Sequence, residues 1–135
     1  MRARSDYEVL AKYACELRNC NQIALEFANR DATRIKSGKN RTGYSELKLF
    51  EDYGFGGCYG LGVIDVHSNF IEPSELVKKR ILYAAKIVKN PFRIYVNPDC
   101  GLRTRTWRQA SKNLETWLPA LKWLENASDE KATPL

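Results

Sequence analysis

The hydrophobic and polar positions of this 135-residue chain follow two alternating patterns. Four segments place apolar residues three or four positions apart, which brings them to one face of a helix. These predicted helices are about 6–18, 44–53, a segment after Pro73 and a segment from about 106. Three short apolar runs predict buried strands at 22–28, 59–66 and 93–96. Helices and strands therefore alternate from one end of the chain to the other.

Local signals mark several of the predicted boundaries. Ser5 and Glu8 have the spacing of a capping box at the start of the first helix. Gly54 is expected to end the second helix, and Pro73 suits the first turn of the third. Pro119 is expected to kink or split the last helix, because proline cannot donate a hydrogen bond to the preceding turn.

Apolar strands joined by amphipathic helices are typical of a parallel α/β architecture with right-handed crossovers. A closed barrel of this type needs eight strands and about 250 residues, so the chain supplies about half of one. An incomplete barrel exposes strand edges and an apolar face that must be covered. We therefore expect a homo-oligomer, or pairing with a separately encoded barrel half.

Composition and charge narrow the class of protein. Hydrophobic residues make up 44% and charged residues 28% of the chain, as in ordinary globular proteins. The net charge is +6, and the basic residues are spread along the chain among sixteen acidic residues. The densest basic stretch, Arg30 to Arg41, lies in a predicted loop at 29–43 and is either a solvated loop or an anion-binding one. We find no nucleic-acid recognition motif, secretory signal or apolar run of about 20 residues, so we expect a cytoplasmic protein that binds neither nucleic acid nor membrane.

Three residues that could carry chemistry lie at or near the ends of the predicted strands: Glu26 interrupts the first apolar run, and His67 and Cys100 follow the second and third. In parallel α/β folds, reacting groups gather at the carboxyl ends of the strands, so these side chains would converge on one barrel mouth. Each also has a structural interpretation: Glu26 could pair with an arginine, His67 could be a packing residue, and Cys100 could be an inert small hydrophobe. The chain has four cysteines without Cys-x-x-Cys spacing, which we expect to be free or metal-bound.

Three motifs resemble one enzyme family. The segment VNPDCGLRTR at 96–105 resembles the zinc-cysteine motif on the last barrel strand of cobalamin-independent methionine synthase. The segment GLGVIDVHS at 60–68 resembles that family's motif one strand earlier, and IALEFANRD at 23–31 is similar to the strand with its zinc-binding glutamate. The resemblance covers about 20–125 and implies the C-terminal portion, about three βα units, of a (β/α)8 barrel.

The resemblance implies a chemistry for five residues. Glu26 and Cys100 would be zinc ligands, and His67 would donate a proton to the departing folate nitrogen. Asp65 and Asp99 fall within the matching motifs and are assigned to substrate binding. The implied reaction transfers a methyl group from a methylated folate to the thiol of homocysteine, with zinc as the cofactor that lowers the pKa of that thiol.

The family's other two zinc ligands form a His-x-Cys pair, and this chain contains none, since its single histidine is followed by Ser68 and Asn69. We expect a catalytic domain at 1–127, incomplete alone, and a disordered tail at 128–135. Two alternatives stay open: a non-catalytic remnant or interaction subunit of the same fold, and a related zinc-dependent enzyme that alkylates a thiol such as coenzyme M. Whether the chain alone is an enzyme is undecided from sequence.

Overall fold

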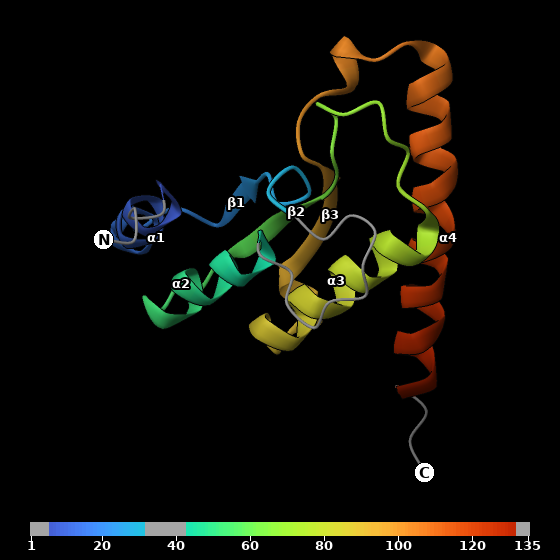
Figure 1. Cartoon of the computed structure of the whole chain (residues 1–135). Coiled ribbons are helices and arrows are strands. Elements are labelled where there is room, and N and C mark those ends of the chain that lie inside the picture. The colour runs from blue at the N-terminus through green and yellow to red at the C-terminus, as the bar shows by residue number, and fades with distance from the viewer. Residues whose placement is uncertain (1–5, 32–42, 132–135) are drawn as a thin grey trace.

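The computed structural model describes residues 6–31 and 43–131, and within them helices and strands alternate as the sequence predicts (Figure 1). The helices are α1 (Asp6–Glu16), α2 (Leu47–Asp52), α3 (Ser74–Val88) and α4 (Trp107–Lys131). The strands are β1 (Gln22–Leu25), β2 (Cys58–Ile64) and β3 (Ile94–Pro98). The described residues include only 29–31 and 43 of the predicted basic loop, so the rest of that prediction lies outside them.

The three strands form one parallel sheet in the order β1-β2-β3. Leu61 of the central strand lies opposite Leu25 of β1 and Val96 of β3. Parallel strands must be joined by crossovers, and the helices between these strands provide them. The predicted parallel α/β architecture is confirmed.

The helices cover one face of the sheet and pack in chain order, α1 on α2, α2 on α3 and α3 on α4 (Figure 1). Tyr59 of β2 faces this layer, with its ring 6.0 Å from that of Phe50 in α2. Phe50 also makes edge-on contacts with Tyr7 of α1 and with Phe55. Aromatic pairs of this geometry contribute stability beyond their buried area, so this cluster fixes α1 and α2 against the sheet.

The opposite face of β2 carries small residues. Gly60 and Gly62 alternate with the helix-facing positions, as successive strand residues point to opposite faces. A β-carbon on Gly60 would lie 2.6 Å from the Asn97 side chain, and one on Gly62 would lie 2.0 Å from a carboxylate oxygen of Asp99. Polar side chains from the end of β3 therefore lie over β2 on this face.

Several predicted boundaries agree with the structure, and others differ. Tyr53 caps α2 and Gly54 follows it with φ of 83°, which glycine adopts without strain. Helix α4 continues through Pro119, so the proline does not split it, and the alternative of a kink stays a prediction. Helix α4 also runs to Lys131, beyond the expected start of the tail at 128; residues 132–135 lie outside the described part, and the division into domain and tail stays a prediction.

Strand β1 ends at Leu25, three residues before the predicted end at 28. The reason is a change of hydrogen-bond acceptor. The amides of Phe27 and Ala28 donate to the side chain of Asp99, and no longer to a neighbouring strand.

In the described part of the chain, no helix is long and apolar enough to cross a membrane.

Candidate functional site

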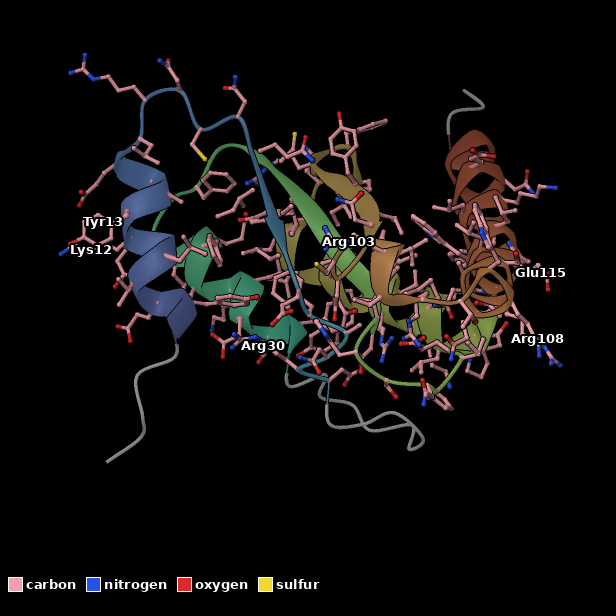
Figure 2. All side chains as sticks on the ribbon, turned by 90° about the horizontal axis from the view of Figure 1, so that it is seen from above. Lys12, Tyr13, Arg30, Arg103, Arg108 and Glu115 are labelled. Atoms are coloured by element: carbon pink, nitrogen blue, oxygen red, sulfur yellow. The ribbon has the colours of Figure 1, made fainter. Side chains whose placement is uncertain are left out.

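Glu26 and His67 meet at the carboxyl end of the sheet. Glu26 directly follows β1, His67 lies in the turn after β2, and Oε2 of Glu26 is 3.5 Å from Nε2 of His67. Both side chains are accessible, 34% for Glu26 and 54% for His67, so a substrate could reach them. Arg30, labelled in Figure 2, lies 4.0 Å from the other oxygen of Glu26 and also stacks on the Tyr7 ring.

The turn with His67 is held by the buried residue Asp65. Its Oδ1 accepts a hydrogen bond from the amide of His67 at 2.8 Å, and its own amide donates to Glu72 at 2.7 Å. Arg105, from the loop after β3, donates to the carbonyl oxygens of Asp65 and Ser68. These contacts join the loops that follow β2 and β3, which lie at the same end of the molecule in Figure 1.

Asp99 follows β3 and binds the backbone after β1. Its Oδ1 accepts hydrogen bonds from the amides of Phe27 and Ala28 at 2.9 Å each, and its Oδ2 accepts one from Asn29 at 2.6 Å. Burial raises the pKa of this carboxyl group to about 6, and the three amide hydrogen bonds oppose the rise. The amide of Asp99 donates to the carbonyl of Ile64, so Asp99 contacts all three strand ends.

A buried arginine lies beneath these loops. Arg80 of α3 is fully buried, and its guanidinium contacts Asp31 at 3.1 Å and Glu72 at 3.0 Å. It also donates to the carbonyl oxygen of Val63 at the end of β2. Buried charges need partners, and here the partners come from the segments after β1 and β2.

Cys100 follows Asp99 and is exposed at the same end of the sheet. The thiolate of Cys100 and the carboxylate of Glu26 are donor types that zinc accepts. Among residues 6–31 and 43–131, no three His, Cys, Asp or Glu side chains cluster closely enough to hold a metal. The donors fit zinc in type, and they amount to half of the ligand set that the family resemblance implies, the other half being the His-x-Cys pair.

The residues that support the site are not evident from the sequence. Arg80 lies three positions after Val77 and four before Ala84, on the buried face of α3, so its signal was a charge on an apolar helical face. Arg105 lies within the motif at 96–105, but the motif does not indicate that its partners are the carbonyl oxygens of Asp65 and Ser68. Glu72 gave no signal, because an acidic residue before a helix is ordinary.

The fold and the site together define a class of protein. Parallel βα units with a carboxylate, an imidazole and a thiol at the carboxyl ends of successive strands form part of a barrel catalytic domain. The family model described as "Cobalamin-independent synthase, Catalytic domain" matches residues 3–122, and the chain belongs to this family. The predicted resemblance is confirmed.

Three curated relatives illustrate the similarity. A methionine synthase of Thermoplasma volcanium is 40% identical over 106 residues, covering 75% of this chain and 30% of that protein. The methionine synthase of Thermoplasma acidophilum is 37% identical over 121 residues, which cover 86% of this chain and 35% of that protein. A 5-methyltetrahydropteroyltriglutamate–homocysteine methyltransferase of Aliivibrio fischeri is 37% identical over 113 residues. These residues cover 80% of this chain and 14% of that protein. The chain thus spans about a third or less of these relatives.

A solved structure gives the same result for the fold. The B12-independent methionine synthase of a Shewanella species, solved in complex with selenomethionine, superposes with a TM-score of 0.69 at 20% identity. The match covers 90% of this chain and 31% of that one. The predicted fold, part of a (β/α)8 barrel, is confirmed.

Proposed function

We propose that this chain supplies the C-terminal part of a zinc-dependent methyltransferase site that transfers a methyl group from a methylated folate to the thiol of homocysteine. The observation that carries the proposal is the pairing of Glu26 with His67 beside the Cys100 turn. The relatives named as methionine synthases and as a homocysteine methyltransferase support the same reaction.

Cys100 and Glu26 are the residues that would hold zinc. A bound zinc ion lowers the pKa of a coordinated thiol, so the thiol is present as a thiolate at neutral pH. The chain's own residues have separate tasks: Cys100 and Glu26 orient the acceptor side of the site, and His67 donates a proton toward the folate nitrogen that loses its methyl group. Accessible side chains at positions 26 and 67 are compatible with this role.

Asp65 is proposed to contribute to substrate binding by contact, and Asp99 by positioning the neighbouring residues of the site. Asp65 is buried and contacts the amide of His67, so it would act close to the donor side of the site. Asp99 lies next to Cys100, so it would act close to the thiol. A cytoplasmic location stays a prediction.

The remaining zinc ligands and the rest of the barrel would come from outside these 135 residues, with a second copy or a complementary barrel half as candidate sources. An open strand edge supports this proposal, because β3 pairs only with β2 among the described residues. Beside it lies an apolar groove of about 370 Å³ between α3, β3 and α4. Phe92, which lines the groove, is 86% exposed. Exposed apolar surface next to an open edge is typical of an interface.

The zinc content per chain tests the proposal, measured by elemental analysis after reconstitution, with the mass in solution determined on the same sample. Near-stoichiometric zinc in an assembly larger than one chain is expected. Cys100→Ser should lose most of the metal, whereas the matched control Cys15→Ser should keep it. Zinc-free protein, both alone and mixed with a complementary barrel part, would overturn the proposal and favour a non-catalytic relative.

A further inference from the structure

We propose that Asp99 is a positioning residue that holds the end of β1 so that Glu26 faces His67. The importance of this pair for methyl transfer rests on the proposed function. The positioning itself rests on contacts within the chain and is tested separately from zinc and catalysis.

The Asp99 side chain reaches across the sheet. It extends from the end of β3, over β2, to the backbone that follows β1. There its two oxygens accept hydrogen bonds from three consecutive amides, those of Phe27, Ala28 and Asn29. A carboxylate that accepts several backbone hydrogen bonds is strongly oriented, because charge-assisted hydrogen bonds are about twice as strong as neutral ones.

Strand β2 leaves space for this side chain. A β-carbon at Gly62 would lie 2.0 Å from Oδ1 of Asp99 and 2.7 Å from the carbonyl oxygen of Leu25. Glycine at this position lets the carboxylate of Asp99 pass over the central strand. Gly62 and Asp99 therefore fit one another sterically, although they come from different βα units.

The Asp99 contact also affects Glu26. The residue before it, Leu25, is the last to pair with β2, and the residue after it, Phe27, donates to Asp99. The chain then turns, with the amide of Arg30 donating to the carbonyl of Phe27. Glu26 is thus fixed between the strand and the Asp99 contact, which accounts for its position 3.5 Å from His67.

Direct contact with a substrate is the competing role for Asp99. Both of its oxygens already accept backbone hydrogen bonds, and the side chain lies over Gly62. A substrate bound by Asp99 would have to replace or share these bonds. The geometry therefore favours an indirect role through Glu26.

The single histidine of the chain makes the proposal testable by NMR, because its ring signals belong to His67 without ambiguity. In the wild-type background, Glu26→Gln should shift these signals. In the Asp99→Ala background, the same substitution should shift them by less than half as much, since Glu26 no longer faces the ring. This double-mutant comparison isolates the coupling between the two residues from general effects.

Val88→Ala is the matched control, because it opens the core at the far end of α3 without touching the site. It should lower stability and leave the coupling unchanged. An unchanged coupling in Asp99→Ala, or an equal loss in both variants, would overturn the proposal. If Asp99→Ala does not fold, Asp99→Asn replaces it. The one remaining carbonyl oxygen should retain part of the coupling between positions 26 and 67, and full retention would contradict the positioning role of Asp99.

The result also separates this proposal from the proposed function. Loss of coupling in a protein that neither holds zinc nor transfers methyl groups would support the positioning role and reject the reaction. Retained coupling in an active, zinc-loaded assembly would reject the positioning role and support the reaction.

Discussion

Arg80 of α3 and Glu72 of the preceding loop form a fully buried ion pair, with Nη1 3.0 Å from Oε1, beneath the turn that carries His67. Glu72 accepts a second hydrogen bond from the amide of Asp65, whose carboxylate accepts one from the amide of His67. The position of the exposed imidazole is therefore linked, through two acidic residues, to helix α3.

Removal of the arginine should be costly. Arg80→Ala removes the cation that pairs with the buried carboxylates of Glu72 and Asp31, and breaking a buried pair in this way costs about 3–5 kcal/mol. Urea unfolding followed by circular dichroism measures the loss. The exposed neighbour Lys79 on the same helix provides the control, because Lys79→Ala should change the free energy of unfolding by less than about 0.5 kcal/mol. A loss below about 1 kcal/mol for Arg80→Ala would contradict the buried network.

Gly62 should tolerate no side chain. Gly62→Ala places a β-carbon 2.0 Å from the Asp99 carboxylate, and forcing atoms into a packed region typically costs about 1–3 kcal/mol. Gly56 is the matched control, since a β-carbon there meets nothing within 4 Å. Gly56→Ala should be neutral or stabilise the fold by about 0.4–1 kcal/mol, because alanine restricts the unfolded chain. Equal unfolding free energies for the two variants would show that the space over Gly62 is not filled.

The elements of this fold could be predicted because their signals are local. The apolar run at 59–66 and the helical face that contains Val77 and Ile81 depend on neighbouring positions, and both elements appear in the structure. The end of β1 could not be predicted in this way. The amides of Phe27 and Ala28, which follow the strand, donate to Asp99 more than 70 positions later in the chain, and the apolar residues alone predict a longer strand.

The same distinction applies to the candidate site. Glu26 and His67 were expected to converge because parallel strands share a carboxyl edge, and they do. The contacts of Arg105 with the turn after β2, and of Arg80 with Glu72, depend on which loops meet in space. A single sequence gives the type of each residue at such positions and leaves the partner unknown.

The cysteines should differ in reactivity. Burial raises the pKa of the Cys15 thiol above its ordinary value, whereas Cys100 is exposed at the end of the sheet. The thiolate is the nucleophile, so iodoacetamide should alkylate Cys100 before Cys15 at mildly alkaline pH. Mass spectrometry of timed samples identifies the modified residue, and Cys100→Ser should remove the fast step. Earlier modification of Cys15 would contradict the exposure of Cys100, and protection of Cys100 by added zinc would support its role as a ligand.

The role of His67 can be separated from that of its turn. If His67 donates a proton to the departing folate nitrogen, His67→Gln should lower kcat for methyl transfer in the assembled enzyme by about 10²–10⁴-fold. The zinc content should stay unchanged, because His67 is not a proposed ligand. Asn69→Ala changes an exposed side chain of the same loop that accepts a hydrogen bond from Gln109. This variant should keep kcat within about twofold, as expected for a surface position. Equal losses in the two variants would assign the effect to the shape of the turn, and an unchanged kcat in His67→Gln would remove the imidazole from the reaction.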